Sequence, residues 1–465
     1  MMARPLGVRK LACALNLRKL ACASLLLLLP LPVLADDARA PMTLAQAVEW
    51  AREHSGLVAA ARAGTGVFEA KLQAAEWTAW PHVEARGILA PMPAERGNAL
   101  AGKTDYSDWG VFLQGELTAY VPLYTFGKIS HLKAASRLGV DVGRAQEAIA
   151  RAEVTYRVKK AFYGLSLSRE LAGIVSEGRG YLDKARKKLD EKASEDDPSF
   201  DPVDRMKLRV IDAQILAKEL EANRTRDLAT GNLRYTMGAS PADETLVFEV
   251  PAPEPVKLAE GATLDSLEAS AKENRPELVA LRRGVRARSE ECAARTATFF
   301  PDLFLAGMGK IGYSNVADNQ ASPFAYDPYN TMTAGGAIGL KFDLDIGKKL
   351  GELAEARANR AKLEADLREA ENGVRLEVEK LHREVTGGRR VVDAMADAEK
   401  AARGWVIAKS DLYDNDMAEV GDVTAALMQF FQARLDRLKA IYDYNVAVAA
   451  LERATGMTVA AEPGP

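Results

Sequence analysis

The chain contains few of the residue types on which metal and thiol chemistry depends. Its 465 residues include four histidines and three cysteines, and none of them shows the spacing of a metal-ligand motif. A nucleophile motif and a phosphate-binding glycine loop are also missing. The sequence therefore predicts no catalytic residue, no metal site and no cofactor.

Long apolar runs and aromatic residues are scarce as well. Charged residues make up 27% of the chain, aromatic residues 7%, and the mean hydropathy is −0.16. A polytopic helical membrane protein needs several apolar runs of about 20 residues, whereas this chain has one long run, near its start. The composition excludes that class and favours long helices over a β-sandwich.

Residues 1–35 indicate an export signal. An apolar core starts at Leu25, ends at the small residue Ala35, and is too short to span a bilayer comfortably. Cys13 and Cys22 precede this core, so a lipid anchor is not expected. Removing the signal makes the mature chain more acidic than the net −3 of the whole chain, which argues against nucleic acid as a partner. The signal begins with basic residues at Arg4, Arg9, Lys10, Arg18 and Lys19.

The two halves of the chain repeat each other at an offset of 220 residues, which falls to 218 near their ends. We therefore predict a tandem duplication with a first repeat at 36–238, a linker rich in proline and acid at 239–262, a second repeat at 263–456 and a tail at 457–465. The matches include residues at element boundaries: Pro81 with Pro301, Gly87 with Gly307, Gly127-Lys128 with Gly347-Lys348, and Gly238 with Gly456.

Each repeat is predicted to contain a helix, two strands, a very long helix and a returning helix. Prolines are absent from 123–197 and from 329–462, and an interior proline costs a helix about 3 kcal/mol. Two apolar stripes on the long helices predict neighbours on both sides, as in a helix bundle or a closed wall of helices. The predicted bounds are strands at about 81–91 and 109–123, a long helix at 128–193 and a return at 202–237, then strands at 301–313 and 332–345, a long helix at 348–413 and a return at 421–455.

The predicted strands alternate apolar and polar residues with a period of two. From Val111 to Val121, for example, Leu113 and Leu117 alternate with Gln114 and Glu116. This alternation is typical of a membrane β-barrel strand and equally of a half-buried soluble hairpin. Aromatic residues near both ends of the strands favour the barrel. Four strands cannot close a barrel, so several copies of the chain would have to contribute to one.

The order of these features resembles that of the TolC-like outer-membrane efflux protein family, over nearly all of the mature chain. The resemblance implies a mostly helical fold with a transmembrane β part. In the family a homotrimer forms a twelve-stranded barrel in outer-membrane lipid and a twelve-helix tunnel through the periplasm. It also implies a periplasmic adaptor and an inner-membrane transporter as partners. The residues that carry it include Asn274-Arg275-Pro276-Glu277-Leu278, Gly127, Gly347, and Tyr442-Asp443-Tyr444-Asn445 through Gly456.

The resemblance further implies a periplasmic gate where the second long helix turns back. Tyr413 and Asp422 stand where the family has a gate tyrosine and an aspartate, and Asp204 stands at the matching place in the first half. Three residues depart from the family pattern, so the latch of the gate differs from the best-known arrangement. These are Ala418 in place of an arginine, Ala425 in place of a second aspartate, and Asp416 at a position usually held by glycine.

Acidic residues crowd this turn independently of any family. Threefold symmetry would repeat them as an acidic ring, which selects for cations; the alternative is a solvated hairpin tip. The predicted gate and selectivity residues are Tyr413, Asp414, Asp416, Asp422 and Asp204, and the predicted adaptor contacts at the helix tips are Asp201, Met417, Glu419 and Gly421.

The function that these features predict is a passive exit duct of a tripartite efflux system in the outer membrane. Two alternatives remain open. The same architecture serves as the exit channel of a type I protein secretion system, and the long helices alone would suit a soluble periplasmic coiled-coil scaffold.

Overall fold

The structure is a computed structural model. It describes residues 40–98, 101–195, 200–259, 263–320, 322, 324–415, 417–418 and 420–460. The predicted export signal, residues 1–35, and the last five residues of the predicted tail lie outside the described residues. None of the described helices combines the length and apolar character that crossing a lipid bilayer requires.

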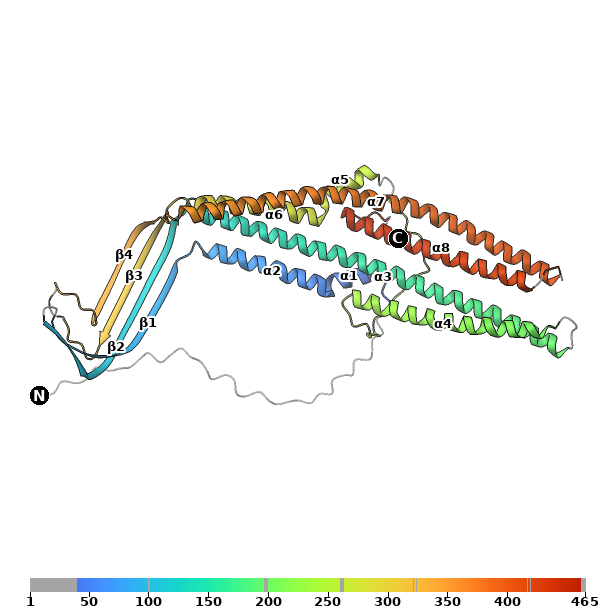
Figure 1. Cartoon of the computed structure of the whole chain (residues 1–465), viewed down its shortest axis with the longest axis horizontal. Coiled ribbons are helices and arrows are strands. Elements are labelled where there is room, and N and C mark those ends of the chain that lie inside the picture. The colour runs from blue at the N-terminus through green and yellow to red at the C-terminus, as the bar shows by residue number, and fades with distance from the viewer. Residues whose placement is uncertain are drawn as a thin grey trace. The chain divides into compact units, whose positions relative to one another are not determined.

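The described chain is mostly helical with one small antiparallel sheet, as predicted (Figure 1). The elements of the first half are α1 (Leu44–His54), α2 (Gly56–Trp77), β1 (His82–Asn98), β2 (Ala101–Tyr124), α3 (Lys128–Ser194) and α4 (Pro202–Thr236). Those of the second half are α5 (Leu264–Asn274), α6 (Pro276–Ala297), β3 (Asp302–Ser314), β4 (Thr331–Lys341), α7 (Ile346–Asp414) and α8 (Val420–Thr455).

Each half begins with two helices where the sequence predicted one. Ser55 separates α1 from α2, and its hydroxyl accepts a hydrogen bond from the N–H of Leu57 at the start of α2. In the second half Pro276 is the first residue of α6, a position where its missing N–H costs nothing because that group is unpaired in any helix. Capping and proline placement therefore divide the first helix of each half at matching positions.

The strands pair in the order β1-β2-β3-β4, with every pair antiparallel. Leu117 in β2 lies opposite Ala85 in β1 and Gly309 in β3. Apart from a bridge between Glu95 and Ala317, no further strand pairs with the outer edges of β1 and β4 in the described part of the chain. The sheet thus has two open edges.

The observed strand bounds differ from the predicted ones. β1 continues to Asn98, seven residues past the predicted end, although it contains Pro91 and Pro93. Proline lacks an N–H and is tolerated on edge strands. Pro91 and Pro93 are two residues apart, so they lie on the same side of the strand. β4 ends at Lys341 rather than at 345 because Asp345 caps α7, accepting a hydrogen bond from the N–H of Lys348.

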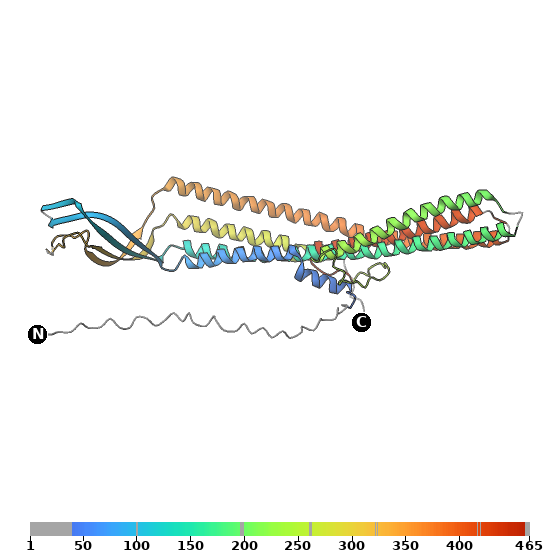
Figure 2. The same ribbon diagram turned by 90° about the horizontal axis from the view of Figure 1, so that it is seen from below.

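The two long helices each continue without a break from the sheet to a turn at the far end of the helical hairpins (Figures 1 and 2). α3 has 67 residues and α7 has 69, or about 100 Å each at about 1.5 Å per residue. α4 packs along α3, and α8 packs along α7. The predicted lengths are close to the observed bounds.

Two hydrophobic cores lie midway along the helices, one in each half. Their buried residues follow the offset of the repeat: Val158 and Val378 are both 0% exposed, and Leu233 and Leu451 are 0% and 1% exposed. The first core includes α1, α3 and α4, whereas the second includes α5, α7 and α8. These cores fix the middle of the helical part.

The linker between the repeats crosses both cores. Phe248 is buried in the first core, and Val256 packs against the second. The main chain of the linker forms a parallel bridge with Met42, which precedes α1, and an antiparallel bridge between Leu258 and Ala460, which follows α8. The linker therefore joins the two halves by packing and hydrogen bonding at the level of the cores.

Candidate functional site

The pairing register sorts the strand side chains into one apolar face and one polar face. Residues directly opposite each other in an antiparallel sheet point to the same side. Every second residue of β2 from Val111 to Val121, which includes Leu113 and Leu117, lies on one face of the sheet. The residues on this face of the neighbouring strands are apolar, aromatic or glycine. The larger members of this apolar face are Val83, Leu89, Val111, Leu113, Leu117, Val121, Leu303, Leu305, Ile311, Met332, Ile338 and Leu340.

The apolar face is uncovered in the single chain. Leu89 is 73% exposed, Ile338 70% and Leu340 69%. From Val111 to Val121 the face extends for about 33 Å along the strand at about 3.3 Å per residue. A strand tilt of about 40° reduces this to a height of about 25 Å, the height of the apolar band of an outer-membrane barrel. A continuous exposed apolar surface of this kind marks a contact with lipid or with protein.

The opposite face carries charges of both signs and other polar residues, together with apolar ones such as Phe112, Phe304 and Met308. Glu116 lies in register between Arg86 in β1 and Lys310 in β3, so opposite charges face each other across the strands. At the end of the sheet next to the helices, Asp302 is in register with Lys341 and forms an ion pair with Lys128 at the start of α3. This face is suited to water.

Exposed aromatic residues lie at two levels of the sheet. At the helical end Phe126 stacks on Phe300 with ring centroids 5.1 Å apart, and Trp80 is exposed close to Trp77. Tyr106, Trp109 and Tyr313 are exposed toward the other end. Aromatic side chains at two levels on either side of an apolar band are typical of the two interfaces of a membrane.

At the α3–α4 turn both predicted acids have local partners. Asp201 caps α4, because its carboxylate accepts a hydrogen bond of 2.8 Å from the N–H of Val203. Asp204 pairs with Lys207 at 2.9 Å. Asp201 therefore caps the start of α4. The charge of Asp204 is partly balanced by Lys207.

At the α7–α8 turn the structure describes Tyr413, Met417, Gly421 and Asp422 among the predicted residues. Asp422, in the first turn of α8, pairs with Lys409 of α7 at 3.0 Å, with half of its side chain exposed. Met417 is 68% exposed. Tyr413 is half-buried near the end of α7, and Gly421 is exposed. Asp416, Glu419 and the side chain of Asp414 lie outside the described residues.

The basic partners of Asp204 and Asp422 were not predicted from the sequence. Lys207 follows Asp204 by three residues on one helix, a spacing that brings side chains together and that was available as a signal. Lys409 is on a different helix from Asp422, and no local spacing indicates that pair. Both lysines lower the negative charge that a ring of these acids would carry.

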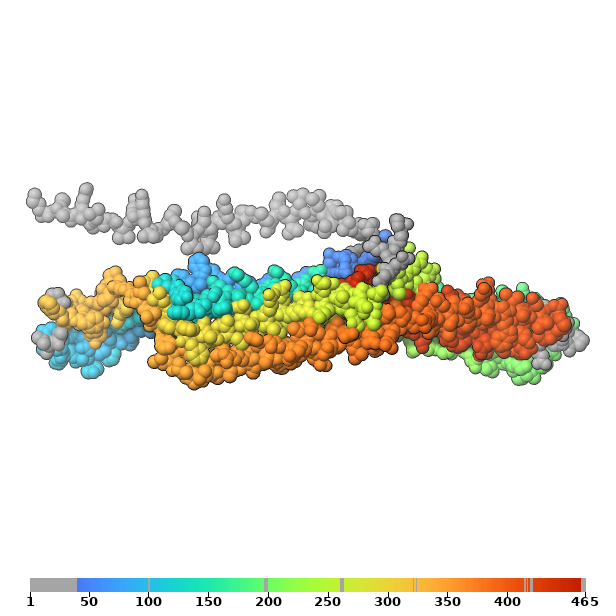
Figure 3. Space-filling model, turned by 90° about the horizontal axis from the view of Figure 1, so that it is seen from above, coloured from blue at the N-terminus to red at the C-terminus, as the bar shows by residue number. Residues whose placement is uncertain are grey.

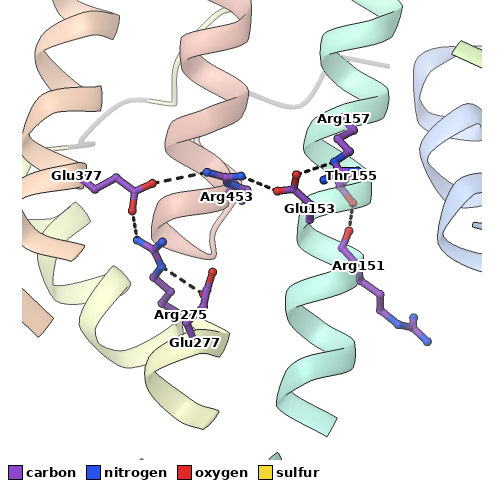
Figure 4. Close-up of polar contacts among 8 residues, drawn as sticks. All are labelled: Arg151, Glu153, Thr155, Arg157, Arg275, Glu277, Glu377 and Arg453. Carbon is purple, nitrogen blue, oxygen red and sulfur yellow. Dashed lines mark hydrogen bonds and ion pairs between the residues drawn. The ribbon is translucent and has the colours of Figure 1, made fainter. Parts of the chain in front are cut away.

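A chain of ion pairs that the sequence did not indicate joins the two halves at the level of the cores (Figure 4). Arg453 of α8 contacts Glu153 of α3 at 2.5 Å and Glu377 of α7 at 3.6 Å. Glu377 also contacts Arg275, which directly precedes α6, at 2.6 Å. Four charged side chains, on or next to α3, α6, α7 and α8, are therefore linked by three ion pairs.

Glu153 is the acid at which this chain meets the first half. Burial opposes the charge of its carboxylate, but hydrogen bonds from Arg157 and Arg453 favour that charge, and the net result is a pKa below its ordinary value. The two arginines approach to 2.6 Å and 2.5 Å. Glu153 is therefore ionised at neutral pH.

Nothing in the described part of the chain suggests a metal centre. No three histidine, cysteine or acidic side chains of the described residues gather closely enough to hold an ion. His131 instead pairs with Glu290, its Nδ1 lying 2.7 Å from the carboxylate. Cys292 is buried in α6 as a free thiol.

Several solved structures share this fold. A membrane protein from Pseudomonas aeruginosa superposes with a TM-score of 0.73 at 16% identity, over 89% of this chain and 93% of that one. The CmeC outer membrane channel of Campylobacter jejuni gives a TM-score of 0.71 at 13% identity, over 90% and 87%. The outer membrane protein VceC of Vibrio cholerae gives 0.70 at 16% identity, over 90% and 96%.

Comparison of the sequence with known families gives a match to one family model. None of the curated proteins matches the chain, but residues 267–457 match the family model described as outer membrane efflux protein. Proteins of this kind are channels and not enzymes. The second repeat is therefore similar to outer membrane efflux proteins, and the described chain shares its fold with solved outer-membrane channels.

Proposed function

We propose that the chain is one subunit of a trimeric exit duct in the outer membrane. The observation that carries this proposal is the continuous apolar face on a sheet whose two edge strands lack outer partners. An open sheet edge is not tolerated in lipid, so β1 of one copy must pair with β4 of the next. Three copies then supply twelve strands and twelve helices in cross-section.

The duct conducts passively. Its polar sheet face, with Glu116 between Arg86 and Lys310, lines a water-filled lumen, and the helices continue that lumen through the periplasm. A periplasmic adaptor and an inner-membrane transporter deliver the cargo and provide the energy, as in a tripartite efflux system. The match of residues 267–457 to the outer membrane efflux protein model supports this assignment.

We place the gate at the α7–α8 turn, near Tyr413 and Asp422, with Asp414 and Asp416 as further acids and Asp204 at the first turn. The adaptor contacts the helix tips at Asp201, Met417, Glu419 and Gly421. The Lys409–Asp422 pair is part of this gate. Lys409 lowers the net negative charge of the acidic ring, so the closed duct is weakly rather than strongly cation-selective.

The lipid face is tested by paired arginine substitutions. Leu117→Arg puts a charge on the apolar face and costs about 2–4 kcal/mol at the bilayer midplane, so assembled protein in the outer-membrane fraction falls sharply. Gln114→Arg, three residues away on the polar face, is the matched control and assembles normally. Equal assembly of the two variants would contradict the assignment of the faces.

The oligomer is tested by extraction. Osmotic shock leaves the protein in the membrane, and mild detergent releases it with the native mass of a trimer. Release by osmotic shock would instead support the soluble periplasmic scaffold. A monodisperse monomer with its full β-sheet signal would exclude closure of a barrel by several copies.

The gate is tested by single-channel recording of the purified trimer in planar bilayers. Asp422→Asn removes negative charge and lowers the preference for cations, whereas Lys409→Gln removes its positive partner and raises that preference. The two variants are matched controls for each other because they are the two sides of one ion pair. Unchanged selectivity in both would place the constriction elsewhere.

A further inference from the structure

A groove of about 720 Å³ lies along the helices directly next to the sheet. Its floor consists mainly of small residues of α3 and α6, and its walls come from α2 and α7. Figures 2 and 3 show α3, α6 and α7 side by side in this order. The lining residues are Phe68, Lys71, Lys128, Leu132, Ala135, Ser136, Gly139, Val142, Gly284, Ala287, Arg288, Glu291, Ala294, Arg295, Thr298 and Leu363.

Glycines in α3 and α6 allow side chains of α2 and α7 to approach the floor of the groove closely. A Cβ on Gly139 would lie 3.3 Å from the ring of Phe68, and a Cβ on Gly284 would lie 3.0 Å from Leu363. The outer helices α2 and α7 therefore both approach the same side of the α3–α6 pair. That side is concave, and its apolar surface includes the half-buried ring of Phe68 and the exposed side chain of Leu132.

One ion pair connects the groove to the polar sheet face. Lys128 lines the groove and pairs with Asp302, which is in register with Lys341 on that face. In the trimeric duct of the proposed function, the polar, concave side is the lumen. Each subunit thus presents one groove to the tunnel, next to the mouth of the barrel.

The groove is basic. Four of its lining residues are lysine or arginine and one, Glu291, is acidic. Lys128 and Arg295 are paired from outside the lining, by Asp302 and Glu352, and Arg288 is paired with Glu291 at 2.6 Å.

Lys71 provides the unbalanced charge. It is exposed, lies 5.6 Å from the ring centroid of Phe68, and forms no ion pair with any residue that the structure describes. The groove therefore combines an apolar floor with a positive charge at its rim, next to an aromatic wall.

We propose that this groove is a binding site for amphipathic anions passing through the duct. The alkyl or ring part of the cargo lies against Phe68, Leu132 and the small residues of the floor, and its anionic group lies at Lys71. The size of the groove is within the range of ligand sites, about 300–1,000 Å³. The proposal rests on the proposed function for the lumenal position of the groove, and it names the class of cargo that this wall retains.

Cysteine protection tests the site on the full-length, detergent-extracted protein. Ala287→Cys, in a background in which Cys13, Cys22 and Cys292 are replaced by alanine, places a single reporter thiol in the groove. Ser289→Cys, on the same helix but outside the lining and exposed, is the matched control. Maleimide labelling is followed with decanesulfonate or decyltrimethylammonium, two probes that share a ten-carbon chain and differ in the sign of their headgroup.

Decanesulfonate should slow labelling at position 287 and leave position 289 unchanged, and decyltrimethylammonium should protect neither. Adding Lys71→Glu should weaken the apparent affinity for decanesulfonate about fivefold, the effect of about one exposed ion pair. Lys133→Glu, on α3 outside the lining, should leave it unchanged. Equal protection by both probes, or an unchanged apparent affinity for decanesulfonate in the Lys71→Glu variant, would overturn the proposal.

The same preparations separate this proposal from the proposed function. All lining residues come from one chain, so protection is measurable whatever the oligomeric state. A conducting trimer without selective protection would overturn the groove site and leave the duct intact. Selective protection in a protein that neither forms trimers nor conducts would support the site and contradict the duct.

Discussion

The two hydrophobic cores of the chain are equivalent in their apolar residues and different in their polar ones. Val158 and Val378 occupy the same position of the repeat and are equally buried. In contrast, Asn445 is buried in the second half, whereas its counterpart at the repeat offset, Asp227, has 72% of its side chain exposed. The duplication thus preserved the apolar packing and not the polar contacts.

The linker explains the difference. The side chain of Asn445 accepts a hydrogen bond from the N–H of Val256 at 2.9 Å and donates one to the carbonyl of Glu254 at 2.8 Å. The hydroxyl of Tyr444 donates to the carbonyl of Val256 at 3.0 Å. Because a single linker serves two halves, each core meets a different part of it. The residues that hold it differ accordingly.

The two glycines that end the return helices provide the largest expected contrast. Both Gly238 and Gly456 have a positive φ, but a Cβ on Gly238 would lie 2.4 Å from the carbonyl oxygen of His54, against 3.2 Å from that of Asn274 for Gly456. Gly238→Ala should cost about 2–5 kcal/mol, from left-handed strain and overpacking together. Gly456→Ala should cost less. Thermal unfolding followed by the helical signal ranks the two, and equal midpoints would contradict the asymmetry.

Asn445→Leu should have the next largest effect. It leaves the N–H of Val256 and the carbonyl of Glu254 without their partner, at a cost of about 2–4 kcal/mol for the two groups. Asp227→Leu, at the matching position of the first half, should change the unfolding midpoint little because that side chain is exposed. Limited proteolysis within the linker gives an independent measurement, since only the first variant should accelerate cleavage there. A stable, uncleaved Asn445→Leu protein would disprove the anchoring role.

Val158→Ala and Val378→Ala should have equal, smaller effects of about 2 kcal/mol each, because both remove the same apolar volume from a fully buried position. The double variant should be additive, since the sites belong to separate cores. Unequal shifts in the unfolding midpoint would indicate that one core relaxes around the cavity and the other does not.

The ion pairs that join the halves should have the smallest effect, about 1 kcal/mol, because the side chains are partly exposed. The folded pKa of Glu153 is below its ordinary value of 4.5, so the stability that its charge contributes is present above that pH and is lost as the pH falls through the folded pKa. Glu153→Gln should therefore reduce the loss of stability below about pH 4.5. Identical acid unfolding of the variant and the parent chain would show that the pair contributes nothing.

Local patterns made much of the fold predictable. The gaps between prolines gave α3 and α7 nearly their full length, and the alternation from Val111 to Val121 predicted one apolar face before the register of the four strands was known. Such features depend on residues within a few positions of each other. The predicted end of the first strand at residue 91 was too early, because whether Pro91 and Pro93 are tolerated in β1 depends on the free edge of the sheet, which no local pattern reveals.

The candidate site was only partly predictable. The acids of the α7–α8 turn were visible as a cluster, but the partner of Asp422 was not, because Lys409 approaches it from the opposite helix. The groove next to the sheet was also missed. Its lining comes from four helices that are far apart in sequence, and residues such as Ala287 or Gly139 have no chemical signature of their own.

The sequence by itself determined the duplication, the lengths of the helices and the two faces of the strands, because periodicity, proline and glycine act over short distances along the chain. The tertiary structure alone decided which charges pair across the middle of the helices, where the linker crosses and how Phe68 and Leu363 lean over one floor. Those arrangements depend on the direction from which separate helices approach each other. That direction is set by the packing of both cores together and by no single segment.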